Sequence, residues 1–177
     1  MTTNDVAKGN VTQRARLSDI LLDGLFAGMI GALVVALWFL VLDLAAGQPL
    51  RTPALLGNVL LHGTAGSGIV TISALEVAAY SAFHFVTFIA VGVFLSYMMT
   101  LFERFPIMFF VLLVLFLCLQ AGFFVLDAIL GAQMINQLKP WTVVVGNVLA
   151  AASMAMFLWK RHPSVLSGVE RLWDDNQ

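Results

Sequence analysis

Long apolar runs alternate with short polar segments along this chain. The first run, 24–42, holds 19 uncharged residues between Asp23 and Asp43. A helix of that length spans about 28 Å at 1.5 Å per residue, close to the roughly 30 Å of a bilayer hydrocarbon core. Further runs of the same kind follow. The pattern therefore predicts four transmembrane helices, at about 19–46, 74–102, 106–130 and 140–161.

These runs predict an all-α integral membrane protein with an up-down bundle of four transmembrane helices in residues 18–162. Residues 1–17 are polar, and we expect a flexible or surface-lying N-terminal arm. Residues 163–177 place Leu166, Val169 and Trp173 at helical spacing. This tail is expected to form an amphipathic helix anchored at the membrane surface, with docking of a soluble partner as the alternative.

The connection after Asp43 contains a short predicted helix at about 53–62. Thr52 followed by Pro53 is typical of an N-cap and a first helical position, and Gly63 offers a stop. At about 10 residues this helix is too short to span, so we expect it to lie in the interface or over the bundle mouth. The next helix opens with Ser73 and Glu76, whose spacing predicts a capping box.

Small residues recur every four positions in two of the predicted helices. Lipid tails give helices no hydrophobic reason to associate, whereas a smooth face lets two backbones approach closely. We therefore expect the smooth face of the fourth helix to pack on that of the first, with a face for another subunit as the alternative. The helix-packing positions are Gly24, Gly28, Ala32, Ala36, Gly146 and Ala150.

The distribution of cations predicts the orientation. The N-terminal arm, the second connection and the tail together hold seven Lys and Arg residues, against two in the first and third connections. Because cytoplasmic segments are enriched in Lys and Arg, both termini are expected on the cytoplasmic side of the cell (inner) membrane. The 53–62 helix then faces outward.

Composition agrees with a membrane protein and narrows the chemistry. The chain is 60% hydrophobic and 11% charged with a net charge of -1, against about 45–50% and 25% in soluble domains. Nothing here indicates nucleic acid as a partner. Cys118 is the only cysteine, and the sequence contains no CxxC or HExxH motif. We therefore predict no metal and no cofactor.

Polar residues inside the predicted spans form one candidate site. In the up-down order, His84, Gln120 and Asn147 fall in one layer, about 10–12 Å from the outer helix ends. One hypothesis is a polar pocket open to the outer face, with His84 at its floor, because buried polar groups in membranes often mark functional sites. The competing interpretation is that these groups only hydrogen-bond across helices. The remaining candidates near the outer rim are Asp43, Asp127 and His62.

The sequence favours a non-enzymatic function. Both candidate aspartates are terminal, no catalytic set is present, and no span is interrupted by the proline that transporters with broken helices often carry. We expect a small membrane protein that acts by association, as an accessory or assembly subunit of a larger membrane complex or by self-association. The alternative is a ligand-, metal- or proton-responsive module that uses the outer pocket.

Overall fold

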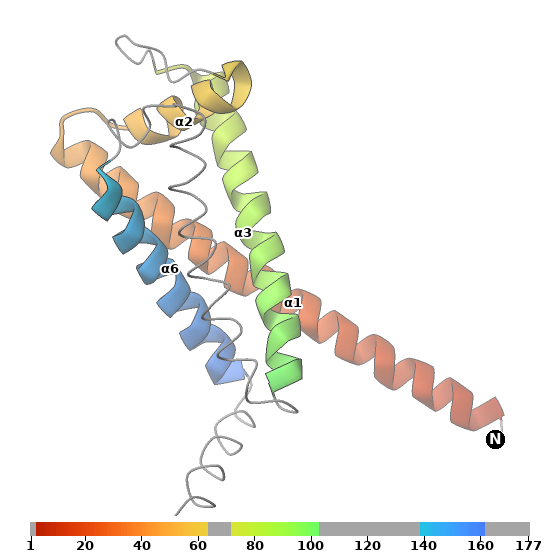
Figure 1. The fold of residues 1–177 in the computed structure, drawn as a ribbon. Helices are drawn as coiled ribbons and strands as arrows, with labels where there is room; N and C mark the ends of the chain where they lie inside the picture. Colours follow the sequence, from red (N-terminus) through yellow and green to blue (C-terminus); the bar gives the residue numbers. More distant parts are fainter. Residues whose placement is uncertain (1–2, 64–71, 103–138, 162–177) are drawn as a thin grey trace, which may run out of the picture.

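The computed structural model describes residues 3–63, 72–102 and 139–161, with side chains outside 3–16 and 100–102 (Figure 1). This part of the chain is all-helical, as predicted, and contains no strand. Its helices are α1 (Thr3–Ala45), α2 (Arg51–His62), α3 (Ala74–Phe102) and α6 (Pro140–Arg161). The expected segments 106–130 and 163–177 lie outside the described residues.

Three of the described helices are long and apolar enough to cross a membrane. The stretches are Leu17–Ala45, Ala74–Met99 and Pro140–Arg161. They match the predicted spans at 19–46, 74–102 and 140–161 to within a few residues, because the length of an uninterrupted apolar run is set by the thickness of the bilayer.

The structure differs from the expectation at the start of the chain. A flexible or surface-lying arm is expected at 1–17, whereas α1 begins at Thr3 and runs without a break into its apolar part. No proline stands between Thr3 and Ala45 to end the backbone ladder. Apolar runs mark only the part of a helix that crosses lipid, so they do not reveal the polar N-terminal extension of α1.

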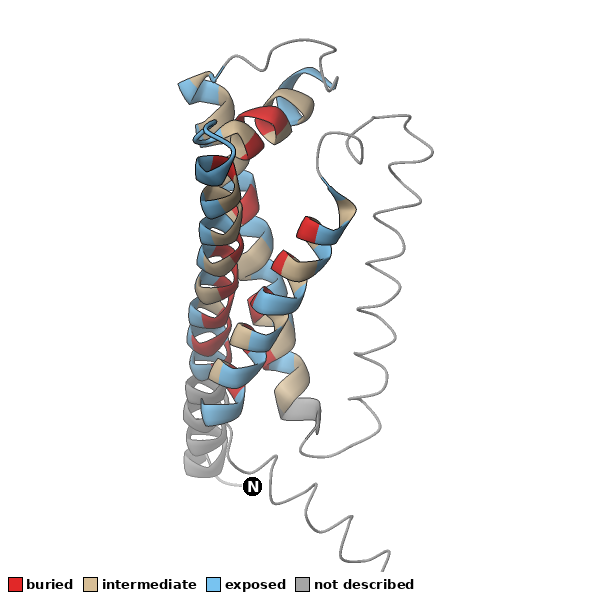
Figure 2. Ribbon diagram, turned by 90° about the vertical axis from the view of Figure 1, so that its left-hand side faces the viewer, coloured by how far each residue is buried: buried red, intermediate tan, exposed pale blue. Residues whose placement is uncertain are grey.

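α1 is the helix against which α3 and α6 pack, whereas α2 packs mainly on α3. It contacts both α3 and α6, whereas α3 and α6 make few contacts with each other. Both run opposite to α1, and α2 lies across the end where α1 stops and α3 begins (Figure 1). Burial follows this arrangement, with the buried positions of α1 forming a stripe along its inner side (Figure 2).

α1 and α3 approach each other so closely that no side chain separates their backbones at the crossing. A Cβ atom on Gly92 would meet the carbonyl oxygen of Gly24 and lie 2.5 Å from the backbone nitrogen of Gly28. A Cβ atom on Gly28 would lie 2.5 Å from Cα of Ile89. The two backbones are therefore in direct contact. Gly24 and Gly28 were expected to face the 140–161 helix, but they face α3, because Gly92 supplies the matching gap.

α6 packs on α1 through other residues. Gly146 lies against Trp38, where an added Cβ atom would be 3.1 Å from the ring Cδ1, and Ala150 is buried. The indole Nε1 of Trp38 donates to the carbonyl oxygen of Thr142 at 2.9 Å. At the other end of α6, Nε of Arg161 donates to Oδ1 of Asp23 at 2.9 Å. α6 is thus attached to α1 near both of its ends.

The other two small residues of α1 divide between core and surface. Ala32 is fully buried, whereas Ala36 is exposed and lines a cavity next to α3. Apolar side chains complete the α1–α6 contact, where Ala27, Met154 and Leu158 form a buried cluster.

Candidate functional site

α2 is fixed in place by a residue of α1. Leu50, which precedes α2, is in the left-handed region with φ of 64°, and its side chain makes no cap. Instead, the carboxylate of Asp43 accepts the backbone N–H of Thr52 and its hydroxyl, each at 2.7 Å. Asp43 therefore fills the capping role expected of Thr52 alone. α2 begins at Arg51 and not at 53. It ends at His62 and is followed, as predicted, by Gly63, which has a φ of 71°.

A second set of contacts joins α2 to the first turn of α3. Gly57 packs directly against the backbone of Glu76. The Asn58 amide donates to Oε1 of Glu76 at 3.3 Å, and Nε2 of His62 lies 3.7 Å from the same oxygen. The Glu76 carboxylate is thus directed toward α2, so the capping box with Ser73 is not formed. Asn58 and His62, four residues apart, present one face of α2 to it.

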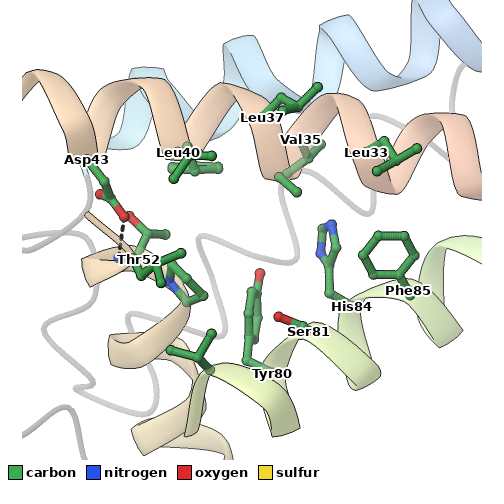
Figure 3. Close-up of a pocket in the computed structure, with 15 residues that line it drawn as sticks. Leu33, Val35, Leu37, Leu40, Asp43, Thr52, Tyr80, Ser81, His84 and Phe85 are labelled. Carbon is green, nitrogen blue, oxygen red and sulfur yellow. Dashed lines mark hydrogen bonds between the residues drawn. The ribbon is translucent and has the colours of Figure 1, made fainter. Parts of the chain in front are cut away.

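α1, α2 and α3 enclose a cavity of about 190 Å³ (Figure 3). Most of its wall consists of apolar side chains, including Leu33, Val35, Leu37, Leu40 and Phe85. The polar residues in its lining are Asp43, Thr52, Tyr80, Ser81 and His84.

His84 is buried in the wall of the cavity, and its ring points toward α1 (Figure 3). Its Nε2 lies 3.2 Å from the carbonyl oxygen of Ala32. Since a carbonyl oxygen can only accept, Nε2 carries the proton of this hydrogen bond, and the neutral ring keeps Nδ1 as an acceptor. The ring also lies 5.6 Å from that of Tyr80 and 4.7 Å from that of Phe88, measured between centroids.

Tyr80 and Ser81 bring hydroxyl groups to the same cavity. The Tyr80 ring extends from α3 toward α1 with its hydroxyl at the tip (Figure 3). Among the described residues, neither of these hydroxyls has a hydrogen-bond partner. Each of these hydroxyls can donate a hydrogen bond to an acceptor in the cavity.

The structure brings some of the predicted site residues together and separates others. His84 and Asp43 line the same cavity. His62 is exposed and lies outside it, against Glu76. Asn147 is half-buried on α6 and is not part of the lining. Gln120 and Asp127 lie outside the described residues.

Three polar residues of the cavity are absent from the site predicted from the sequence, namely Thr52, Tyr80 and Ser81. The sequence does contain a signal for Tyr80 and Ser81, because they precede His84 by four and three residues and therefore share its helix face. Thr52 is predicted only as a helix cap. Its position in the cavity follows from the turn that brings α2 back over α1.

Apart from the Asp43 carboxylate, the polar groups in the described lining of the cavity are hydroxyls and one imidazole. Each oxygen of the Asp43 carboxylate accepts one hydrogen bond from Thr52, which stabilises its charge. Within the described ranges, no three His, Cys, Asp or Glu side chains are placed to hold a metal ion. The arrangement suits the binding of a neutral molecule through hydrogen bonds and apolar contacts.

Comparisons of the chain with protein-family models, with curated proteins and with solved structures found no match.

Proposed function

We propose that this chain is a non-enzymatic, multi-pass protein of the cell (inner) membrane that acts by association, as an accessory or assembly subunit of a larger membrane complex. Its partners would be the lipid bilayer and other membrane subunits, or further copies of itself. The observation that carries the proposal is an exposed row of small residues on α3.

The row lies on the side of α3 that faces away from α1. Only 11% of the residues in the spanning stretch of α3 are buried. The exposed positions recur every fourth residue, and all but Val86 are alanine: Ala74, Ala78, Ala82, Val86 and Ala90. Within a bilayer, such a flat face favours close packing against another helix, because backbones that approach closely gain dispersion contacts.

A four-span bundle fits the direction of the described helices. α3 ends at one end of the bundle and α6 begins at the opposite end (Figure 1). We propose that the apolar run at 106–130 is the crossing that returns the chain, and that 163–177 lies on the membrane surface. The Asp23–Arg161 contact places the start of the apolar part of α1 and the end of α6 at one end. The excess of Lys and Arg assigns that end to the cytoplasm.

Association is tested by replacing alanines of the exposed row on α3 with larger residues. The variants Ala82→Leu and Ala90→Leu add bulk to the exposed face of α3, and Ala152→Leu adds the same bulk to an exposed position of α6. Native gels of membranes solubilised in mild detergent should show a large species that both α3 variants shift to a smaller one and that the control leaves unchanged. A wild-type chain that migrates alone after crosslinking in intact membranes would refute the proposal.

The orientation is tested with single cysteines in a Cys118→Ser background. A cysteine in place of Gln48 should react with an impermeant maleimide in intact cells, whereas one in place of Lys160 should react only after permeabilisation. Both positions are exposed, one just after the end of α1 and the other near the end of α6, and these two helices run in opposite directions (Figure 1). The reverse pattern would invert the topology.

A second candidate function is favoured by the cavity, which holds His84 and Asp43 together. In this case the protein is a ligand-responsive membrane module. His84→Ala should then abolish the retention of a co-purifying small molecule and leave the native-gel species unchanged. Loss of the native-gel species without loss of a ligand would argue against a role for the cavity.

A further inference from the structure

We infer that the cavity between α1, α2 and α3 binds an uncharged, membrane-soluble molecule whose carbonyl group enters it and accepts a hydrogen bond from Tyr80. This inference rests on the second candidate function and names its class of ligand. It does not depend on whether the protein has a partner.

The polar groups of the cavity select an acceptor without charge. The two hydroxyls without a partner among the described residues, those of Tyr80 and Ser81, can each donate a hydrogen bond. Asp43 is occupied by Thr52, and Nε2 of His84 by Ala32. A charged ligand in this apolar surrounding would need an opposite charge to offset its desolvation. The described lining holds no Lys or Arg that could offset an anion, and the hydroxyl donors of Tyr80 and Ser81 favour an acceptor over a cation, so a neutral acceptor fits best.

The size of the cavity limits what can enter. An apolar cavity of about 150 Å³ holds one benzene molecule, and this cavity measures about 190 Å³. One small ring or one ester group with the start of its chain therefore fits, whereas a whole lipid does not. The remainder of any larger ligand must lie outside the cavity.

The wall of the cavity shows where that remainder can lie. Leu33 and Leu37 line the cavity and are 46% and 58% exposed. Both belong to the spanning stretch of α1, and Leu33 lies about 15 Å along the helix from Asp43. The cavity therefore reaches an exposed side of the spanning stretch of α1. This side of the cavity would admit a ligand from the bilayer.

The test uses the purified full chain in dodecyl maltoside and a tritiated decyl-substituted benzoquinone as the probe. This probe offers a ring with carbonyl groups and an apolar tail. Unlabelled decylbenzene, which has the ring and no carbonyl, and dioctanoylglycerol, which has ester carbonyls and no ring, serve as competitors. We expect saturable binding of one probe per chain, and much weaker displacement by decylbenzene.

Two pairs of variants distinguish the loss of a hydrogen bond to the ligand from a general loss of folding. Tyr80→Phe keeps the ring and removes the hydroxyl, and it should weaken binding roughly 5- to 10-fold, the worth of one hydrogen bond. Tyr97→Phe makes the same change on an exposed part of α3 and should leave binding unchanged. Ala36→Phe should fill the cavity and abolish binding, and Ala152→Phe adds the same side chain outside it.

The outcomes distinguish the source of the carbonyl. Stronger displacement by unlabelled quinone than by dioctanoylglycerol supports a ring carbonyl, and the reverse supports a lipid ester. Equal displacement by decylbenzene together with unchanged binding in Tyr80→Phe would overturn the inference, as would the absence of saturable binding. A chain that binds the probe but forms no larger species on native gels would refute only the association proposal.

Discussion

The carboxylate of Asp43, at the end of α1, receives both hydrogen-bond donors of Thr52, at the start of α2. The backbone N–H and the hydroxyl each lie 2.7 Å from a different oxygen of the same carboxylate. Asp43 is 6% exposed and Thr52 5% exposed, so little water competes for these bonds. Because α2 has no cap of its own, this pair holds α2 over the cavity.

Removal of this carboxylate should loosen α2. We expect Asp43→Ala to lower the free energy of unfolding by about 2–4 kcal/mol, because two buried donors lose their acceptor. Asp43→Asn, which keeps one acceptor oxygen, should cost less. The measurement is unfolding in mixed micelles with increasing dodecyl sulfate. Asp19→Ala changes an exposed aspartate of the same helix and serves as the control. Equal losses in Asp43→Ala and Asp19→Ala would contradict the role of the pair.

The glycine contacts predict a ranking of three substitutions to alanine. At Gly92 and Gly28 the added Cβ atom would meet backbone atoms of the facing helix, which cannot move independently. At Gly146 it would meet the Trp38 side chain at 3.1 Å, which can shift slightly. We expect Gly92→Ala and Gly28→Ala to cost several times more stability than Gly146→Ala, as judged by the melting temperature in detergent. A Gly146→Ala variant that melts below the other two would contradict the packing.

Three helices that could span a membrane were predicted from the sequence, and the partners of their faces were not. The length of each apolar run predicts a span, because the thickness of the bilayer fixes how many residues a helix needs to cross it. Gly24 and Gly28 indicate a close approach, but the matching gap is Gly92, on a side of α3 that also carries the bulky residues Phe88 and Ile89. A pattern within one helix cannot show which helix will face it.

The candidate site was only partly visible for a similar reason. His84 stood out because it is an ionisable residue inside a span, and Tyr80 could have been grouped with it by its spacing. The role of Asp43 depends on the turn after α1, where Gly47 has a φ of 70° and the chain reverses. That turn converts an aspartate expected at the mouth of a pocket into the cap of α2.

The hydrogen bond from Trp38 to Thr142 should contribute measurably to the free energy of unfolding, because it attaches α6 to α1. Trp38→Phe removes the indole donor and keeps an aromatic ring beside Gly146, so we expect a loss of about 1 kcal/mol plus the smaller packing area. Trp159→Phe, at an exposed position of α6, is the matched control. The readout is again the free energy of unfolding. A larger loss in the control would assign the stabilising role to the membrane interface instead of the helix contact.

The ion pair at the opposite end of α6 should show a small, salt-dependent coupling. The side chain of Asp23 is 11% exposed, whereas that of Arg161 is 54% exposed, so solvent screens the attraction from one side. In a double-mutant cycle of Asp23→Asn and Arg161→Gln we expect a coupling free energy of about 0.5–1 kcal/mol. High salt should reduce the coupling. Lys160→Gln, which changes the neighbouring exposed cation, should show none with Asp23→Asn. Additive effects of Asp23→Asn and Arg161→Gln at low salt would mean that the pair does not hold α6 to α1, and that the contact of Met154 and Leu158 with Ala27 is sufficient.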